Sequence, residues 1–214
     1  MTKKASVVRR KRALPKPLRE EFRDYARAAI LEAGEEVLAE QGLHLARMEE
    51  VASKARVAVG TIYNLIGDRD ALVVEILSVR HRELLKLMAA TLERVRPLPF
   101  REQVQGCVVA LLGYFREHSR FFRLVSESER GPACPHRRLS QETLAEIRRH
   151  YRELVARGIK QRALRSEGRA LYPAMLMGMM REVIIQDLET GPAIAADDRV
   201  SQILDVFMLG AGAR

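Results

Sequence analysis

The chain has 214 residues, of which 47% are hydrophobic, 5% are aromatic and none is Trp. This apolar content excludes an intrinsically disordered protein, and the length allows one or two domains. Ala, Leu, Glu and Arg are abundant, which favours helix over strand and predicts an all-α protein. No segment reaches 18 apolar residues and no apolar run follows the basic N-terminus, so we expect no membrane insertion, no secretion and a cytoplasmic location.

The positive charge is concentrated at the N-terminus. The formal net charge is +9, and residues 1–19 contain eight basic side chains and no acidic one. These basic residues are Lys3, Lys4, Arg9, Arg10, Lys11, Arg12, Lys16 and Arg19. A block of this kind forms either a solvated flexible tail or an arm that binds nucleic acid. The context supplied by the rest of the chain decides between the two.

Three helices are predicted first in the chain. Apolar residues recur every three or four positions from Phe22 to Val37, which predicts a helix that ends near Gly42. The same periodicity predicts a short helix over Met48–Ala55 and a second short helix that begins at about Ala58. Two short helices joined by a tight turn form a helix-turn-helix.

The remainder of the chain is also predicted to be helical. Asp68 can cap a long helix that ends near Pro97, with Asp70 in its favourable first turn. The later elements are a helix to about His118, a short apolar element from Phe121 to Val125, a loop from Gly131 to Arg138, a helix from about Ser140 to Arg162, a helix from Leu171 to Leu188 and a last helix around Val200 to Leu209. The chain therefore has about nine predicted helices.

The second short helix has an outer face suited to contact with a ligand. Its inward residues are Val57, Ile62 and Ile66, and its outward residues are Val59, Gly60, Tyr63 and Asn64. Gly60 allows close approach of the backbone, and the hydroxyls of Thr61 and Tyr63 suit phosphates. The Asn64 amide can pair with an adenine edge in the major groove. Double-stranded DNA is therefore the expected partner, and charge from the arm would supply affinity.

Residues 30–72, ILEAGEEVLAEQGLHLARMEEVASKARVAVGTIYNLIGDRDAL, resemble the DNA-binding region of the TetR family of bacterial transcriptional regulators. The G-T-I-Y core, the preceding E-V-A-S-K-A and the following D-R-D-A-L fall at that family's spacing. The resemblance implies a homodimer with a basic arm over residues 1–19 and a three-helix DNA-binding domain with a helix-turn-helix over residues 20–67. It further implies a larger helical domain for effector binding and dimerisation over residues 68–214.

The motif departs from the family pattern at several positions, among them Leu65 and Ile66, where two aromatics are common. Arg56 stands where the family usually has Gly, and Ala58 stands where it usually has a capping Ser. Ala46 replaces a usual capping Thr, while Glu49 is expected to retain the other half of a capping box. Basic side chains that contact phosphates can compensate for the missing caps. Arg69 occupies the family's usual Lys position, where a phosphate contact is expected. The expected DNA contacts are Arg47, Arg56, Val59, Gly60, Thr61, Tyr63, Asn64 and Arg69, with Arg9, Arg10, Lys11 and Arg12 of the arm.

The last two helices are apolar on more than one side. Twelve of the eighteen positions over residues 171–188 are apolar, too many for one buried stripe. The second apolar side can meet another copy of the chain, or both helices can be central in one large core. The residues expected at a dimer interface are Met180, Ile184, Ile203, Leu204 and Phe207.

An effector pocket is expected among the helices of the larger domain. Its candidate residues are His81, Met88, Cys107, Leu111, Tyr114, Tyr151, Tyr172, Met175 and Met179, which are apolar or amphipathic and lie on expected inner faces. An ordinary core would contain the same residues. The methionine cluster near the C-terminus suits adaptable core or interface packing rather than a cofactor site.

These features favour a ligand-responsive transcriptional regulator. We expect a homodimer that binds a palindromic operator, represses by the family's usual mode and is released by a small-molecule effector of unknown identity. The alternative is a helical interaction protein on the same scaffold with decayed, non-specific DNA binding. An enzyme is not expected, because there is no Gly-rich phosphate loop, H-E-x-x-H or Ser elbow. Cys134 and His136 are too few to form a metal site, and no cofactor is expected.

Overall fold

The computed structural model describes residues 16–42, 45–120, 122, 137–190 and 196–211. Its elements are α1 (Lys16–Gln41), α2 (Met48–Ala55), α3 (Val59–Leu65), α4 (Arg69–Val95), α5 (Phe100–Glu117), α7 (Arg137–Lys160), a 3₁₀ helix (Ser166–Gly168), α8 (Tyr172–Thr190) and α9 (Ala196–Ala211). These eight α-helices confirm the all-α prediction, since the described residues contain no strand. None of the described helices combines the length and the apolar character needed to cross a membrane.

Several sequence predictions lie outside the described residues. They are the arm residues Arg9, Arg10, Lys11 and Arg12, the Cys134 and His136 pair, and most of the apolar element over residues 121–125. The ninth predicted helix therefore has no counterpart among the elements above.

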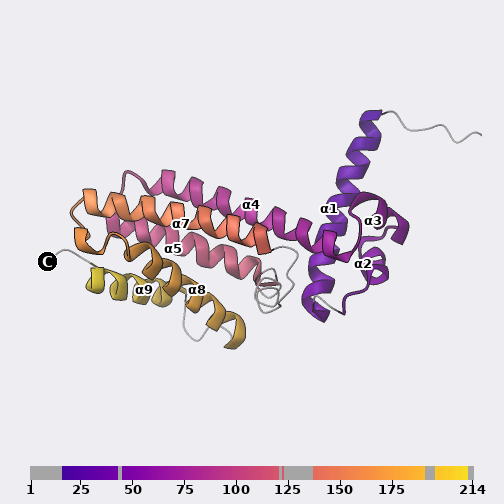
Figure 1. The fold of residues 1–214 in the computed structure, drawn as a ribbon. Helices are drawn as coiled ribbons and strands as arrows, with labels where there is room; N and C mark the ends of the chain where they lie inside the picture. The colour runs from indigo at the N-terminus through magenta and orange to yellow at the C-terminus, as the bar shows by residue number, and fades with distance from the viewer. Residues whose placement is uncertain (1–15, 43–44, 121, 123–136, 191–195, 212–214) are drawn as a thin grey trace, which may run out of the picture.

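The helices form two bodies joined by α4 (Figure 1). Helices α1, α2 and α3 gather at one end of the molecule, and α5, α7, α8 and α9 form an elongated bundle at the other. Helix α4 packs against α1 with its N-terminal part and against α5 and α7 farther along. One continuous helix therefore belongs to both bodies.

The N-terminal core lies between α1, α2, α3 and the first turns of α4. Ile30, Leu38, Ile62 and Leu72 are almost completely buried there. A Cβ on Gly34 of α1 would lie 3.0 Å from a methyl group of Leu72. The glycine therefore lets α1 and α4 approach closely, which a larger residue would prevent without displacing Leu72.

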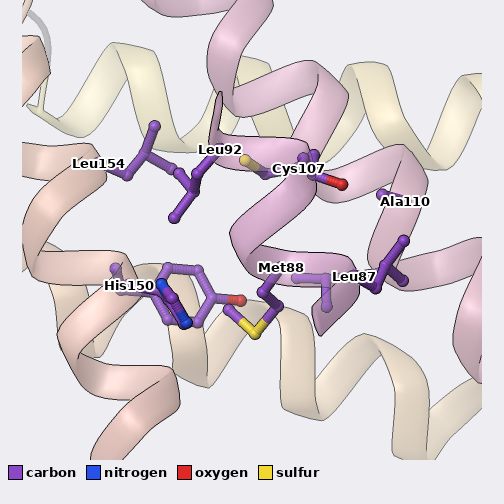
Figure 2. Close-up of a pocket in the computed structure, with 10 residues that line it drawn as sticks. Leu87, Met88, Leu92, Cys107, Ala110, His150 and Leu154 are labelled. Atoms are coloured by element: carbon purple, nitrogen blue, oxygen red, sulfur yellow. The ribbon is translucent and has the colours of Figure 1, made fainter. Parts of the chain in front are cut away.

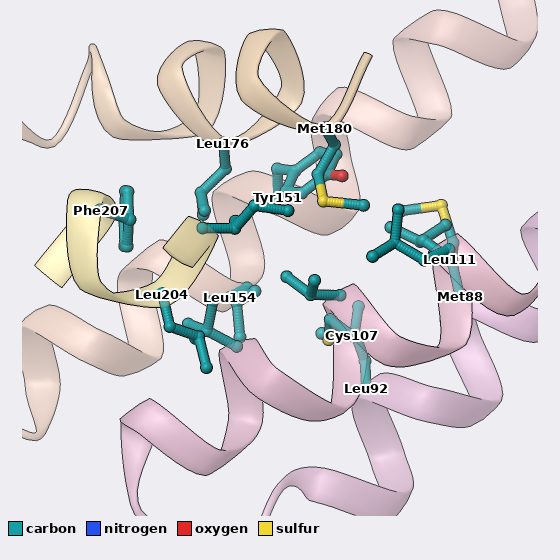
Figure 3. Close-up of a cluster of buried hydrophobic side chains, with 14 of the residues drawn as sticks. Met88, Leu92, Cys107, Leu111, Tyr151, Leu154, Leu176, Met180, Leu204 and Phe207 are labelled. Carbon is teal, nitrogen blue, oxygen red and sulfur yellow. The ribbon is translucent and has the colours of Figure 1, made fainter. Parts of the chain in front are cut away.

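The larger core fills the bundle (Figure 3). Phe100 at the start of α5 and Phe207 in α9 are completely or almost completely buried, as are Leu154 of α7 and Leu176 of α8. Helix α7 begins at Arg137, earlier than the predicted start near Ser140. Within its first turns Arg138 pairs with Glu142 at 2.9 Å, and such an i,i+4 pair favours helix where a loop was expected.

The five predicted dimer-interface residues face the interior of their own chain. Met180 and Ile184 of α8 and Ile203, Leu204 and Phe207 of α9 are each at most 5% exposed and pack in the larger core. Figure 3 shows Leu204 and Phe207 directed toward the α7 and α8 side chains of the bundle. The prediction of an interface through these side chains is wrong, because burial in the chain's own core leaves them no surface to offer a partner.

Candidate nucleic-acid interface and apolar cavity

Helices α2 and α3 are joined by the tight turn that the sequence predicts. Arg56 follows α2 with φ of 56°, in the left-handed region that glycine adopts most easily. Its backbone N–H donates to the Ser53 carbonyl oxygen at 3.2 Å, and the Val57 N–H donates to the Ala52 carbonyl oxygen at 3.0 Å. These bonds stabilise the turn although a non-Gly residue in this conformation costs roughly 1–2 kcal/mol.

The caps of the three helices near this turn differ. Ala58 precedes α3 and Arg47 precedes α2, and neither side chain makes a capping hydrogen bond. The predicted role of Glu49 as half of a capping box is wrong, because Arg47 precedes α2 and Glu49 is the second residue of the helix rather than the third. Asp68 caps α4 as predicted, since its carboxylate accepts the Ala71 N–H at 2.9 Å.

The outer face of α3 is largely free of contact with the rest of the chain. Ile62 is completely buried, whereas Gly60, Tyr63 and Asn64 are exposed, Tyr63 by 52%. Val59 was expected on this outer face, but it is half-buried and packs against the N-terminal core. It is the first residue of α3.

Tyr63 shares an open cleft with two arginines. The cleft has a volume of about 410 Å³, and its lining residues are Ala46, Arg47, Met48, Glu49, Tyr63, Asp68, Arg69 and Asp70. It lies where α2 and α4 begin, so the N-termini of two helices are near one another, and that of α4 is already capped by the Asp68 carboxylate. Helix N-termini attract anions such as phosphate, and arginine forks add to that attraction.

The remaining predicted DNA contacts do not line this cleft. Arg56, Gly60, Thr61 and Asn64 lie along the turn and α3. The structure thus separates a cleft with charged side chains, two arginines and three carboxylates, from a neutral helix face. This division suits an interface in which phosphates are held beside the bases that are read.

Charged side chains fix α3 and α2 on α1. Arg27 of α1 donates to the Leu65 carbonyl oxygen at the end of α3 at 3.0 Å and to Glu75 of α4 at 2.6 Å. Lys54 of α2 lies 2.6 Å from Glu36 of α1, and hydrogen bonds from Lys54 and then Arg120 lower the pKa of the Glu36 carboxyl below its ordinary value. These contacts hold α2 and α3 in place against α1, and so fix the position of the outer face of α3.

A small apolar cavity lies in the bundle between α4, α5 and α7 (Figure 2). Of the nine predicted pocket residues, four line it, namely Met88, Cys107, Leu111 and Tyr151. Its other lining residues, which the sequence prediction missed, are Leu87, Thr91, Leu92, Ala110, His150 and Leu154. Periodicity on α4 and α7 places most of these on inner faces, so helical spacing was the available signal.

Five predicted pocket residues lie elsewhere in the same body. The Nδ1 atom of His81 is 2.8 Å from the Thr143 hydroxyl, and the Tyr114 hydroxyl donates to the Arg80 carbonyl oxygen at 2.7 Å. Tyr172 packs edge-on against the Phe207 ring. Met175 and Met179 are half-buried against the larger core. These side chains pack the bundle and do not line the cavity, so their assignment to the pocket is wrong for this cavity.

Metal binding finds no support among the described residues, where no three His, Cys, Asp or Glu side chains are grouped to hold an ion.

Residues 30–76 match the family model described as "Bacterial regulatory proteins, tetR family". This segment runs from the middle of α1 through α2 and α3 into α4. It contains Tyr63, Arg47 and Arg69, the three predicted residues that line the cleft. No curated protein matches the chain.

Solved structures share the fold over most of the chain. The transcriptional regulator FadR from Bacillus subtilis, in complex with stearoyl-CoA, is 17% identical, with 86% of this chain and 98% of that chain covered and a TM-score of 0.73. A TetR-like transcriptional regulator from Rhodococcus sp. RHA1 is 18% identical, with 92% and 98% covered and a TM-score of 0.69. The TetR family regulator PfmR from Thermus thermophilus is 20% identical, with 84% and 97% covered and a TM-score of 0.68.

The uncapped start of α3 leads to a stability prediction. Ala58→Ser should raise the free energy of unfolding by about 1 kcal/mol, because a serine oxygen at this position can accept a backbone N–H of the first turn. Urea denaturation followed by circular dichroism measures the change. Asp68→Ala, which removes the existing cap of α4, is the matched control and should lower the stability by a similar amount. An unchanged midpoint for Ala58→Ser would show that the N–H groups at the start of α3 are already satisfied.

Proposed function

We propose that this chain, which has the DNA-binding domain and the fold of the TetR family of bacterial regulators, is a ligand-responsive transcriptional regulator that binds a palindromic operator as a homodimer. Repression with release by a small-molecule effector is the family's usual mode and is the mode we propose. The observation that carries the proposal is the exposed face of α3 beside a cleft that contains Arg47, Tyr63 and Arg69.

Each part of this surface has a distinct role in the proposal. Arg47 and Arg69 bind phosphates beside the N-termini of α2 and α4, and the Tyr63 hydroxyl donates to a phosphate oxygen. The Asn64 amide contacts a base edge, and Gly60 lets the backbone of α3 enter the major groove. The basic residues of the arm and Arg56 add affinity that does not depend on sequence.

Ligand response is supported by the bundle and by one structural relative. The bundle contains an apolar cavity whose wall includes part of α4, the helix that also enters the N-terminal core. The Bacillus subtilis FadR of similar fold was solved in complex with stearoyl-CoA. A ligand that shifts α4 would change the separation of the two α3 helices in a dimer, and so the fit to the operator half-sites.

A homodimer through the outer faces of α8 and α9 replaces the interface predicted from the sequence. Val206 and Leu209 lie three residues apart on α9 and are 62% and 86% exposed. Leu171, directly before α8, is 60% exposed. Helices α8 and α9 lie together along one side of the bundle, so these side chains belong to a surface that a second copy can cover (Figure 1).

The second candidate function is an interaction protein on the same scaffold that no longer reads sequence. The absence of capping side chains at Arg47 and Ala58 favours it, because the two helices that present the surface begin without that support. Such a protein would bind DNA through its basic arm alone. Its affinity would then be independent of sequence and would fall steeply with salt.

DNA binding by the full chain separates these two functions. Fluorescence anisotropy should show a preference of roughly 10³-fold for DNA from upstream of the chain's own gene over scrambled DNA, retained between about 50 and 200 mM salt. Asn64→Ala should reduce this preference, whereas Tyr63→Phe should weaken binding to both DNAs through loss of a phosphate contact. Tyr25→Phe, on an exposed tyrosine of α1 outside the cleft, is the matched control and should change neither. Equal binding to both DNAs, with selection from random DNA yielding no preferred site, would favour the second function.

The dimer surface can be tested by the same substitution on two faces of α9. Val206→Glu with Leu209→Glu should yield folded monomers in sedimentation velocity, because it places carboxylates on the face of α9 that the dimer would bury. Leu204→Glu with Phe207→Glu should instead unfold the chain, since it buries charge in the chain's own core. Val109→Glu, on an exposed position of α5, is a control that should leave the dimer intact. A dimer that survives the first pair of changes would place the interface on another surface.

A further inference from the structure

The cavity between α4, α5 and α7 is narrow and partly open at its edge. The space inside it is about 20 Å³, room for about one water. Figure 2 shows Leu92 and Cys107 on one side of it, with Met88 and His150 across from them. A ligand must therefore move side chains to enter, and the chemistry of the walls decides what kind of ligand can remain.

The walls carry no charged side chain. Four of the lining residues have polar atoms, namely Thr91, Cys107, His150 and Tyr151, and all four are buried. Burial raises the pKa of the Cys107 thiol to about 11 and also raises the pKa of the Tyr151 hydroxyl, so both are protonated near neutral pH. The nearest cations that act on the Cys107 thiol, Arg157 and Arg94, do not line the cavity. A carboxylate or phosphate moved into these walls would therefore lose its hydration and contact no opposite charge.

Among the residues that line the cavity, His150 carries a polar atom without a hydrogen-bond partner. It is 6% exposed, and its Nδ1 atom is buried without a hydrogen-bond partner. Burial, followed by the nearby charge of Arg149, lowers the pKa of the imidazole, which favours the neutral ring. The accessible surface of the cavity is apolar, so Nδ1 reaches a ligand only when side chains around it move. An unpaired buried polar atom costs roughly 1–3 kcal/mol, which a ligand recovers if it then supplies the missing hydrogen bond.

A second buried histidine shows what a purely structural one looks like in this bundle. His81 of α4 is 7% exposed, nearly the same as His150, but its Nδ1 lies 2.8 Å from the Thr143 hydroxyl. That hydroxyl in turn donates to the Leu139 carbonyl oxygen at 2.9 Å. The difference lies in the partner and not in the depth of burial, and only the unpartnered histidine lines the cavity.

Flexible side chains surround the cavity and can make room. Met88 lines it, and Met180 of α8 belongs to the same core (Figure 3). Leu87, also in the wall, is only half-buried. Unbranched thioether side chains change rotamer readily, so the space beside His150 can grow without breaking a hydrogen bond of the fold.

We infer that this cavity binds an uncharged, mainly apolar small molecule that carries one hydrogen-bonding group, and that Nδ1 of His150 is the atom that receives this group. That the molecule acts as the effector rests on the function proposed above. Its binding does not, because the cavity and the unpaired nitrogen are properties of the bundle alone. A molecule whose charged group must be buried is excluded as a ligand of this cavity.

Isothermal titration calorimetry with 1-octanol and octanoate at the same pH tests the inference. The two probes share an alkyl chain and differ in charge. The full chain should bind 1-octanol at least tenfold more tightly than octanoate, because no cation lines the cavity. His150→Phe should weaken 1-octanol binding by about tenfold, the effect of losing one buried hydrogen bond. His118→Phe, the same change at a half-buried histidine outside the cavity, should leave it unchanged.

Two results would overturn the inference. One is octanoate binding as tightly as 1-octanol, and the other is unchanged 1-octanol affinity in His150→Phe. If circular dichroism shows that His150→Phe does not fold, the variants His150→Gln and His150→Leu take its place. His150→Gln should retain most of the 1-octanol affinity, because its amide keeps a hydrogen-bonding group, whereas His150→Leu should lose it. None of these titrations contains DNA, so a failure of operator binding leaves their outcome untouched and bears only on the proposed function.

Discussion

Everything in this molecule depends on one helix being shared by two cores. The first turns of α4 bury Leu72 and Ile76 with α1, α2 and α3, and the later turns bury Leu84 and Leu92 in the bundle. A helix of 27 residues is about 40 Å long and bends little without Pro or Gly, neither of which occurs within α4. The three N-terminal helices and the bundle are therefore packed on the same stiff helix, and the direction of α4 relates the two.

Polar contacts at the junction of the two cores tighten this constraint. Glu35 of α1 is buried and accepts from the Arg80 guanidinium at 2.7–2.8 Å, and Arg80 also pairs with Glu83 at 2.9 Å. The carbonyl oxygen of the same Arg80 accepts the Tyr114 hydroxyl of α5. A shift of α4 against α5 therefore either moves α1 with it or breaks the half-buried ion pair between Arg80 and Glu35. This geometry supplies a physical path from the cavity walls to the surface that we propose to bind DNA.

The sequence predicts the N-terminal elements well because local rules determine them. The position of α2, the start of α3 near Ala58 and the cap at Asp68 follow from apolar spacing and capping chemistry, and all three are confirmed. The faces of α9 could not be assigned in the same way. Leu204 and Phe207 are buried while Val206 and Leu209 are exposed. All four are apolar, so composition gives no sign of which stripe meets the chain's own core and which remains outside.

The residues of the cavity could also be predicted only in part from the sequence. Helical spacing correctly brings Met88, Cys107, Leu111 and Tyr151 together. It does not distinguish His150 from His81, because each lies on an inward face of its helix. What separates them is a partner 62 positions away along the chain, the Thr143 hydroxyl beside His81. Contacts between distant segments decide which polar groups are satisfied, and a single sequence does not contain them.

The most direct test of coupling through α4 is the affinity for upstream DNA with and without a saturating cavity ligand. If α4 transmits the change, 1-octanol should weaken DNA binding of the full chain by at least about fivefold, the lower end of measured allosteric couplings, and DNA should weaken 1-octanol binding by the same factor. In His150→Phe, concentrations of 1-octanol that saturate the unmodified chain should have a smaller effect. Unchanged DNA affinity, while calorimetry shows the cavity to be occupied, would contradict the mechanism.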